Sequence, residues 1–390
     1  MRAVWGRAGL LVFSLLVPVC AARLPCRVYT VADGLPNNDT TAILPDTRGL
    51  VWIGTVEGLA RFDGTRFRTY DARDGLPHPV VTFVAETRDG TLWVGTGRGL
   101  CRLLPKQENG RLFQCYAPGP DRADSVVLTL FEDSKGGLWL GTNSGAFRVL
   151  RTNGGKGAVR FEKLDLGFGP EETDFAIRGF CEHPSGEMWA SGGGGLFRWR
   201  PGGRVERFTT REGLPQNEAI PILCDSRGRV WAGFWNSGVV LLAPSPMPGR
   251  PVVERTYRGW GTEVLNAVGD LHETPDGRIL ATTTNALTEL EPGPGGRELR
   301  VRRFGKKQGL GSDLVDDIAE DREGNLWLTS SDAGVTKILR RGFVSYGVED
   351  GIPNPDTYVL MDVEGAGLVA SRGGFLYWFD GRGFRTVKLN

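Results

Sequence analysis

Histidine side chains, which could serve as metal ligands or general bases, occur at three positions of this chain. We place His183 and His272 on short polar turns inside repeated units, and His78 on a segment that crosses between units. The three side chains are therefore not expected to meet. This pattern argues against a histidine-based metal or nucleophile site, and we predict neither a metal nor a cofactor.

Carboxylates gather at two places in the sequence: Glu171-Glu172 with Asp174, and Asp313 with Asp316 and Asp317. A glycosidase needs two carboxylates held across one bond. A lyase or hydrolase acting on carbohydrate is therefore the enzymatic alternative. Acidic residues are common on protein surfaces, however, and we predict no catalytic residue.

Two tryptophans form the most specific candidate binding pair. Trp235 (GFWNSG) replaces small polar residues in a loop between the second and third strands of one unit, and Trp260 (YRGWGTE) replaces the crossing into the next unit. Both loop types share one face in the architecture inferred below. Exposed indoles on adjacent units could stack on the apolar face of a sugar ring, whereas the plainer interpretation packs each indole under its own loop.

Polar residues in the equivalent loops could supply hydrogen bonds to the same ligand. Each of them could equally be a solvated loop residue. The candidates are Asn236, Asn285, Arg98, Asn143, Asp332 and Arg372.

A repeated ten-residue stretch must position all of these loops. It first appears complete at Asp46–Thr55 (DTRGLVWIGT) and returns at Asp133–Thr142 (DSKGGLWLGT). Leu280 and Val369 occupy the slot of its tryptophan in two further units. A period in the forties without a helical pattern is the signature of a radially repeated β architecture. Its tryptophans lie 41, 46, 50, 42 and 96 residues apart, at Trp52, Trp93, Trp139, Trp189, Trp231 and Trp327.

Each unit reads as four short strands. In the first unit, an apolar strand leads through the turn Asp46–Gly49 to the tryptophan strand, and Gly58-Leu59 opens a third strand. The turn Asp63-Gly64 then closes a hairpin onto the fourth strand, and Asp-Gly between short β-prone runs is a strong hairpin signal. The tryptophan offers a large flat surface that should fill the wedge between neighbouring units.

The succession of Asp33–Pro36 (DGLP), Asp46–Thr55 and Gly58–Gly64 resembles the two-component regulator propeller repeat, and the likeness covers nearly all of the chain after its first residues. The resemblance implies the periplasmic sensing region of bacterial membrane-bound regulators, often hybrid histidine kinases, that commonly recognise carbohydrate breakdown products. Such proteins typically add a second propeller, an immunoglobulin-like module, a membrane helix and a signalling domain. No kinase or other output domain is expected within these residues.

We predict an all-β chain in which residues 23–390 form a single β-propeller of four-stranded antiparallel blades, built from eight repeats. A lone strand at Cys26–Thr30 adds a further fourth strand, so two blade numbers are compatible with the sequence. An eight-bladed ring with one terminal strand displaced is preferred. A seven-bladed ring with the eighth repeat left over is the alternative.

Charge and the first residues bear on location and partners. The 47 Lys and Arg residues balance 46 Asp and Glu residues, so no basic footprint for nucleic acid or a membrane surface is expected.

Residues Met1–Ala22 read as a signal peptide, with two arginines, an apolar run and a cleavage site near Cys20. A lipoprotein signal at Cys20 is the alternative. We expect a periplasmic or secreted protein.

Five cysteines follow the leader, an odd number that leaves at least one thiol without a partner inside the chain. Cys101 and Cys115 flank one hairpin and are the only pair that the sequence makes plausible. Their alternative role is that of buried small apolar residues. The spacing and the lack of a Cys-x-x-Cys motif argue against a zinc site.

These inferences combine into one expected function. We predict an extracytoplasmic ligand-binding sensor propeller of a two-component-type signalling system that recognises an oligosaccharide and does no chemistry of its own. A membrane-bound histidine kinase or another signalling module would be its partner. A protein-docking platform with a broad apolar face is the further alternative.

Overall fold

The computed structural model describes residues 23–119, 126–151, 159–169, 172, 174–200, 202–244, 252–260, 263–265, 267–292, 299–340, 352, 359–363, 367–372, 375–379 and 384–388. The predicted leader, Met1–Ala22, lies outside them. Across the described residues the fold is all-β, as predicted, and its helices are 3-10 turns of three residues. None of the helices in these ranges is long and apolar enough to cross a membrane.

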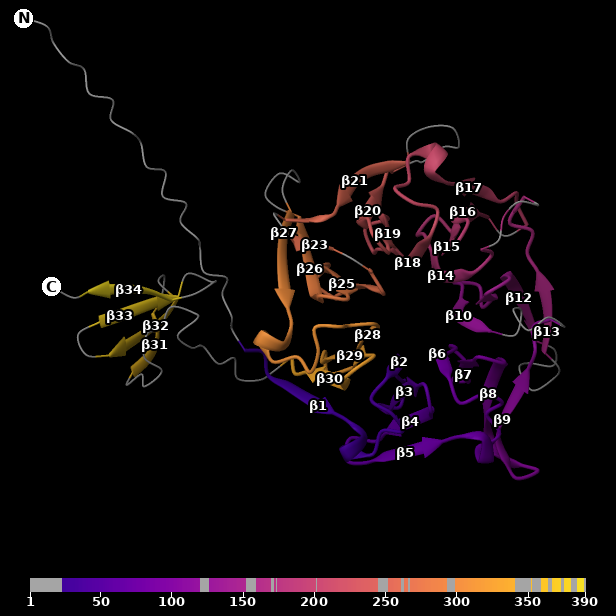
Figure 1. The fold of residues 1–390 in the computed structure, drawn as a ribbon, viewed down its shortest axis with the longest axis horizontal. Helices are drawn as coiled ribbons and strands as arrows, with labels where there is room; N and C mark the ends of the chain where they lie inside the picture. The colour runs from indigo at the N-terminus through magenta and orange to yellow at the C-terminus, as the bar shows by residue number, and fades with distance from the viewer. Residues whose placement is uncertain are drawn as a thin grey trace, which may run out of the picture. The chain divides into compact units, whose positions relative to one another are not determined.

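The unit Pro25–Gly342 is a ring of seven four-stranded antiparallel sheets, called blades 1 to 7 here (Figure 1). Blades 1 to 3 comprise β2 (Thr40–Pro45), β3 (Val51–Thr55), β4 (Gly58–Phe62) and β5 (Phe67–Tyr70); β6 (Val81–Glu86), β7 (Leu92–Thr96), β8 (Gly99–Glu108) and β9 (Arg111–Tyr116); and β10 (Val127–Glu132), β11 (Leu138–Thr142), β12 (Gly145–Arg151) and β13 (Val159–Lys163).

Blades 4 to 6 follow the same order. They comprise β14 (Ile177–Glu182), β15 (Met188–Gly192), β16 (Gly195–Trp199) and β17 (Glu206–Phe208); β18 (Ala219–Cys224), β19 (Val230–Phe234), β20 (Gly238–Leu242) and β21 (Val253–Tyr257); and β24 (Leu271–Glu273), β25 (Ile279–Thr283), β26 (Ala286–Pro292) and β27 (Leu299–Phe304). A two-stranded hairpin, β22 (Gly259–Trp260) and β23 (Glu263–Val264), precedes blade 6.

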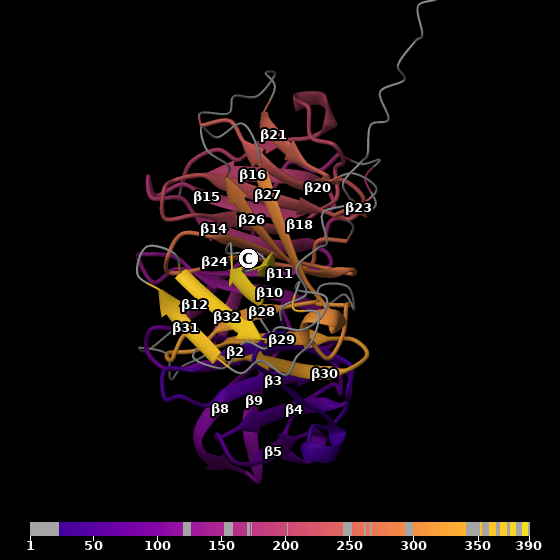
Figure 2. The same cartoon turned by 90° about the vertical axis from the view of Figure 1, so that its left-hand side faces the viewer.

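Blade 7 takes its outermost strand from the start of the chain. It contains β28 (Ile318–Glu320), β29 (Leu326–Ser330) and β30 (Gly334–Ile338), and β1 (Cys26–Tyr29) pairs antiparallel with β30. The innermost strands contact one another in sequence around the ring, and β28 contacts β2. The ring is therefore closed by both ends of the unit. Figure 2 shows it from the side, with β14 to β16 in the upper half and β3 to β5 in the lower half.

The preference for eight blades is wrong, and the seven-bladed alternative describes the ring. The reason is that the junction between blades 7 and 1 is already filled. Trp327 packs there against Tyr29 and Ile43, and the Thr40 hydroxyl donates to the carbonyls of Ser330 (3.0 Å) and Gly334 (2.9 Å). No wedge remains for a further blade.

The eighth repeat forms a four-stranded sheet of its own in the second unit, which includes residues Phe343–Asn390. Its strands are β31 (Val359–Val363), β32 (Gly367–Arg372), β33 (Phe375–Phe379) and β34 (Phe384–Lys388). Ala370, Tyr377 and Phe384 are buried in a small core of this sheet together with Ile352. The repeat thus folds locally like a blade without belonging to the ring.

A hydrogen bond between an aspartate and a tryptophan recurs in the blades. In blade 1 the Asp46 carboxylate accepts the backbone N–H groups of Arg48 and Leu50 (both 2.9 Å), which shapes the turn between the first two strands. Its second oxygen accepts the indole N–H of Trp52 (3.0 Å). The same indole bond joins Trp139 to Asp133, Trp231 to Asp225 and Trp327 to Asp321, at 2.8 to 2.9 Å.

The indoles of these tryptophans lie between blades, as predicted. Trp52, Trp93 and Trp189 are at most 1% exposed. Each packs against core residues of the following blade: Trp52, for example, contacts the cluster that contains Val81 and Val94. The interface between successive blades is called a seam here. In the blades that carry it, the repeated tryptophan therefore fills the seam.

Carboxylate clasps join several seams on the face that carries the turns between first and second strands, called the lower face here. The Glu182 carboxylate, at the end of β14, accepts both the backbone N–H (2.5 Å) and the hydroxyl (2.6 Å) of Ser134 in the preceding blade. Thr47 with Glu86 and Ser226 with Glu273 repeat this clasp.

The Asp-Gly-Leu-Pro motif forms a capped turn at the crossing between blades. The 3-10 turn η1 (Val31–Asp33) is capped because the Thr30 N–H donates to the Asp33 carboxylate (2.9 Å). Gly34 then takes the left-handed conformation (φ 112°), which glycine adopts without strain. Leu35 is thereby buried in the seam core. The turns η2 (Ala72–Asp74), η3 (Thr210–Glu212) and η5 (Lys306–Gln308) repeat this arrangement.

Two disulfides are present among the described cysteines. Cys101 and Cys115 are bonded across β8 and β9, as the hairpin spacing favours. Cys181 is bonded to Cys224 across the seam between blades 4 and 5, a pair that the sequence did not reveal. Cys26 is free, and burial raises the pKa of its thiol to about 11.

Trp139→Ala should lower the free energy of unfolding by about 3–5 kcal/mol, because it empties the seam between blades 3 and 4. Denaturant titration measures the loss. Trp235→Ala, at a side chain 51% exposed, is the matched control and should cost less than about 0.5 kcal/mol. Equal costs for the two variants would contradict the seam role.

Asp46→Asn should cost about 1–3 kcal/mol near neutral pH, because the amide cannot accept from all three donors. Burial favours the neutral acid, but the hydrogen bonds from Trp52, Leu50 and Arg48 hold the pKa of Asp46 below its ordinary value. The stabilisation is therefore complete above about pH 4 and is lost as the pH falls through the folded-state pKa. The gap between the unfolding free energies of the two proteins, measured between about pH 6 and about pH 3, should narrow toward the acid end. A gap that stays constant over this range would refute the role of the carboxylate.

Candidate functional site

The upper face of the ring carries the turns between second and third strands and the crossings between blades. These two loop types touch: the N–H of Asn143 donates to the carbonyl of Val126 (3.3 Å), and that of Gly193 to Ala176 (3.0 Å). A hydroxyl at the end of the second strand closes the turn, as when Thr142 donates to the Gly145 carbonyl (3.0 Å). The scaffold thus holds these loops in fixed positions on one face.

Trp235 is half-exposed on this face, in the turn between β19 and β20. Its carbonyl accepts the N–H of Ala267 (2.5 Å), and the N–H of Leu265 donates to the carbonyl of Arg258 (2.8 Å). The hairpin β22–β23, which contains Trp260, is enclosed by Arg258 and Leu265, and Ala267 follows it in the sequence. The Trp235 turn thus contacts the segment that directly follows this hairpin. The Trp260 side chain lies outside the described side chains, so a joint aromatic platform stays a prediction.

Charged groups bridge the seam between blades 4 and 5, on the other side of blade 5 from the Ala267 contact. Arg178, on the innermost strand β14, lies 3.3 Å from the Glu218 carboxylate at the start of blade 5 and 3.5 Å from that of Asp174. The Gln216 side chain accepts the backbone N–H of Asn236 (3.4 Å), which ties this group to the tryptophan turn. Through Gln216 the turn that carries Trp235 is therefore connected to the segment that holds Glu218.

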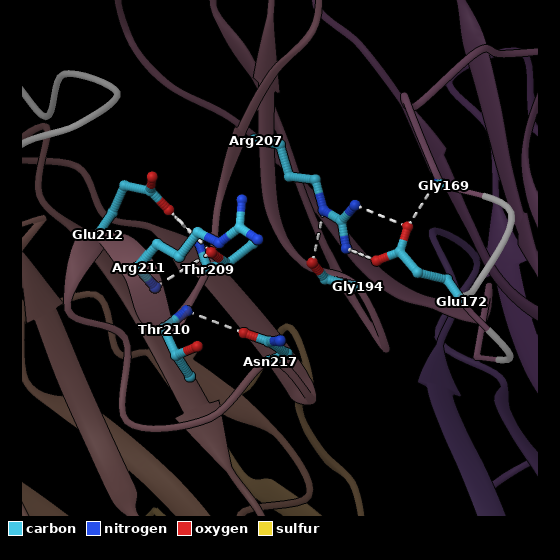
Figure 3. A network of polar contacts seen from close by, with 9 residues as sticks. All are labelled: Gly169, Glu172, Gly194, Arg207, Thr209, Thr210, Arg211, Glu212 and Asn217. Atoms are coloured by element: carbon cyan, nitrogen blue, oxygen red, sulfur yellow. Dashed lines mark hydrogen bonds and ion pairs between the residues drawn. The ribbon is translucent and has the colours of Figure 1, made fainter.

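Two neighbouring networks hold the backbone around this cluster (Figure 3). The Arg207 guanidinium donates to the Gly194 carbonyl (2.8 Å) and makes a two-pronged ion pair with Glu172, which keeps the pKa of that acid below its ordinary value. On the other side, the N–H of Thr210 donates to the Asn217 side chain (2.8 Å). Asn217 lies between Gln216 and Glu218, so this bond positions both.

The other predicted loop residues are distributed around the ring. Arg98, Asn143, Asn236, Asn285 and Asp332 are exposed in turns between second and third strands, as expected. Arg372 belongs to the eighth repeat in the second unit, and its side chain lies outside the described side chains. Of the predicted set, Trp235 and Asn236 are neighbours in one turn, and Trp235 contacts Ala267 after the Trp260 hairpin.

The sequence reasoning missed Arg178, Gln216 and Glu218. A signal for the first was present, because Arg178 stands on the innermost strand where blades 1 and 2 carry Thr41 and Thr82. Glu218 and Gln216 occur in a crossing whose motif resembles the others, so nothing in the sequence distinguished them.

The candidate acids have other partners. Glu172 pairs with Arg207 and Asp174 with Arg178, while Asp313 accepts the backbone N–H of Lys306 (2.8 Å). Glu171 lies outside the described residues. Glu172, Asp174 and Asp313 are thus engaged within the fold, whereas one carboxylate oxygen of Asp316 is buried without a hydrogen-bond partner among the described residues.

Asp317 forms a pair with Asp270, a residue that the sequence had not singled out. Both lie on the innermost side of blades 6 and 7, and their carboxyl groups hydrogen-bond to each other. Burial raises the pKa of Asp270 well above its ordinary value, and the Asp317 carboxylate raises it further. Asp317 accepts the N–H groups of Ile43 (2.9 Å) and Ile318 (2.8 Å). Burial also raises the pKa of Asp317, but these two N–H donors favour its ionised form, so we assign the proton to Asp270; the pair joins blades 6, 7 and 1.

The three histidines lie in different blades and have different contacts. His183 lies on a lower-face turn, as predicted, and its imidazole contacts the Gly228 carbonyl (2.9 Å). His272 lies in β24, not on a turn, and its imidazole is 3.5 Å from the Glu320 carboxylate. His78 is on a crossing and accepts the N–H of Val80 (3.1 Å). Among the described residues no group of three metal-ligating side chains converges.

The two component regulator propeller family model matches three repeats of the chain, at residues 34–57, 75–98 and 121–144. No curated protein matches the sequence.

Solved structures share the fold. The extracellular domain of a putative hybrid two component system from B. thetaiotaomicron is 20% identical (TM-score 0.70), and the match covers 93% of this chain and 49% of that one. This chain thus spans about half the length of that domain. A catalytically inactive virginiamycin B lyase from Staphylococcus aureus with quinupristin is 14% identical (TM-score 0.61; 81% and 99% covered). PorZ, a surface component of the type-IX secretion system of Porphyromonas gingivalis, is 15% identical (TM-score 0.61; 91% and 54% covered).

Asp270→Asn should stabilise the ring at alkaline pH and change little in acid. The raised pKa means that protonation of Asp270 stabilises the fold at low pH, and this contribution is lost as the pH rises through the folded-state pKa. An asparagine donates the same hydrogen bond at every pH.

Asp317→Asn is the matched variant. It should cost about 1–3 kcal/mol, because its amide would face two N–H donors. Thermal unfolding at about pH 4 and about pH 8 measures both effects. The assignment of the proton would be reversed if Asp317→Asn proved the stabilising change.

Proposed function

Because the chain carries two component regulator propeller repeats on a seven-bladed ring, we propose that it is the ligand-binding sensor of an extracytoplasmic two-component-type signalling system. Its ligand is an oligosaccharide, bound on the upper face of blade 5, between its seams with blades 4 and 6. The protein is exported, and its partner is a membrane-bound histidine kinase or another signalling module. The likeness to extracellular domains of hybrid two component systems supports the sensor role.

The half-exposed indole of Trp235 is the observation that carries the proposal. It is one of the large apolar side chains most exposed among the described residues, and it lies on a rigid turn beside Arg178, Gln216 and Glu218. A flat apolar ring next to paired donors and acceptors matches a sugar, which has apolar C–H faces and a rim of hydroxyl groups. Arg178 is paired with the carboxylates of both Glu218 and Asp174, so no positive charge is left over to attract an anionic sugar, and an uncharged sugar is the proposed class.

The proposed ligand role includes no catalysis. Glu172 and Asp174 are engaged in ion pairs, and burial keeps Asp270 protonated to higher pH than an ordinary carboxyl. The enzymatic alternative shares its scaffold with a lyase, but a similarity of 14% identity carries the fold alone.

Trp235→Ala and Trp260→Ala should each weaken glycan binding by about tenfold or more, because each removes one stacking surface. The ligand is first identified by screening the full chain on an array of neutral oligosaccharides. The best glycan is then titrated by calorimetry against the wild type and each variant. Trp235→Phe, which keeps an aromatic face, should retain most of the affinity.

The melting temperature of Trp235→Ala should stay close to that of the wild type, because the side chain is exposed. A marked loss of stability without a selective loss of glycan binding would refute the platform. Turnover of the glycan during the titration would favour the enzyme, and a protein ligand with no glycan ligand would favour the docking platform.

A further inference from the structure

The seam between blades 4 and 5 lacks both halves of the carboxylate clasp. Pro184 stands at the turn position of Ser134 and Ser226, and proline has no N–H to donate. Cys224 pairs with Val230, the first residue of β19, just as Glu182 pairs with Met188, the first residue of β15. Cys224 therefore occupies the position of the clasping glutamate. The disulfide from Cys224 to Cys181 crosses this seam instead.

Blade 4 also lacks the aspartate that anchors the seam tryptophan. His183 occupies its position, and the buried indole N–H of Trp189 has no hydrogen-bond partner among the described residues. On the lower face, the contact of His183 with the Gly228 carbonyl remains. The disulfide therefore replaces polar links that other seams possess.

A cavity of about 430 Å³ opens beside this disulfide on the lower face. Cys224 lines the cavity and is partly exposed, whereas Cys181 is 7% exposed and does not line it. The volume lies in the range of small-molecule sites. A small thiol entering the cavity would therefore reach the sulfur of Cys224 first.

The charge of the cavity selects among thiols. Glu182 and Glu273 line it, and each carboxylate is clasped by the neutral donors of a serine. Asp225 also lines it but is paired with Arg229 (2.6 Å). Two carboxylates that have no cationic partner among the described residues repel an anionic thiol and tolerate an uncharged or cationic one.

The same two strands position the proposed ligand site. Cys181 and Cys224 lie at the lower-face ends of β14 and β18, and the Arg178–Glu218 bridge lies at their upper-face ends. We propose that Cys181–Cys224 is a thiol-exchange site for small uncharged or cationic thiols, and that its oxidation state sets how firmly β14 and β18 hold this bridge. The effect on ligand binding rests on the function proposed above.

The exchange is a two-electron reduction in two steps. The thiolate of the first small thiol attacks the Cys224 sulfur, the bond to Cys181 breaks, and Cys181 leaves as a thiolate that takes up a proton. A second thiol attacks the mixed disulfide on Cys224. The products are a protein dithiol and one small-molecule disulfide, so two thiols supply both electrons and both protons.

The chemistry is tested on the full chain with cysteamine (cationic), 2-mercaptoethanol (uncharged) and 2-mercaptoethanesulfonate (anionic). Alkylation and mass spectrometry follow each disulfide separately, so Cys101–Cys115 is the internal reference. Cys181–Cys224 should be reduced about tenfold faster than the reference by the first two thiols, and least readily by the anionic one.

Glu273→Gln is the matched variant for the charge effect. It should speed reduction of Cys181–Cys224 by the anionic thiol about threefold, leave the reference disulfide unchanged, and lose this advantage at high salt. Reduction of Cys181–Cys224 only at the rate of global unfolding, or at a rate independent of thiol charge and of residue 273, would overturn the proposal.

The mechanical part is tested by hydrogen exchange, which needs no ligand. Selective reduction should speed amide exchange in β14 and β18 and leave β2 and β6 unchanged. The triple variant C181A/P184S/C224E rebuilds the clasp of the other seams, and its exchange should be slow and indifferent to thiols. Unchanged exchange on reduction would refute the mechanical part even if glycan binding is real, whereas faster exchange without any glycan ligand would refute only the proposed function.

Discussion

The wedge between neighbouring blades is the constraint on which this molecule depends. A large flat side chain fills it, yet an indole buried there carries an N–H group that costs about 1–3 kcal/mol if it stays unpaired. One aspartate, six residues before the tryptophan, accepts that N–H and two backbone N–H groups of the intervening turn. Turn geometry and seam packing are thereby fixed together, and the loops of the upper face inherit their positions from them.

This coupling explains what could be predicted from the sequence. The recurrence of Asp46 and Trp52 at fixed spacing reveals the strands, the turns and the burial of the tryptophan, because all of these are local consequences of one unit. The number of blades is not local. It depends on β1 pairing with β30, roughly three hundred residues apart, and the residues of Cys26–Tyr29 would suit the edge of any blade.

The candidate site and the second disulfide were harder to predict for a related reason. Arg178 and Glu218 meet across a seam, as do Cys181 and Cys224, which are 43 residues apart. That separation is close to one repeat, and it was the available sign that the two cysteines occupy neighbouring blades. Trp235 was accessible to sequence reasoning because it departs from the repeat inside a loop whose other features are preserved.

The seam between blades 4 and 5 thus combines the departures from the repeat, with a disulfide on its lower face and the Trp235 cluster on its upper face. Hydrogen exchange of the full chain, with and without the neutral oligosaccharide selected on the array, tests most directly whether ligand binds there. The account predicts slower exchange at Gln216–Glu218 and Trp235–Ser237. Protection confined to lower-face turns such as Asp133–Gly136, with no change at these upper-face segments, would contradict it.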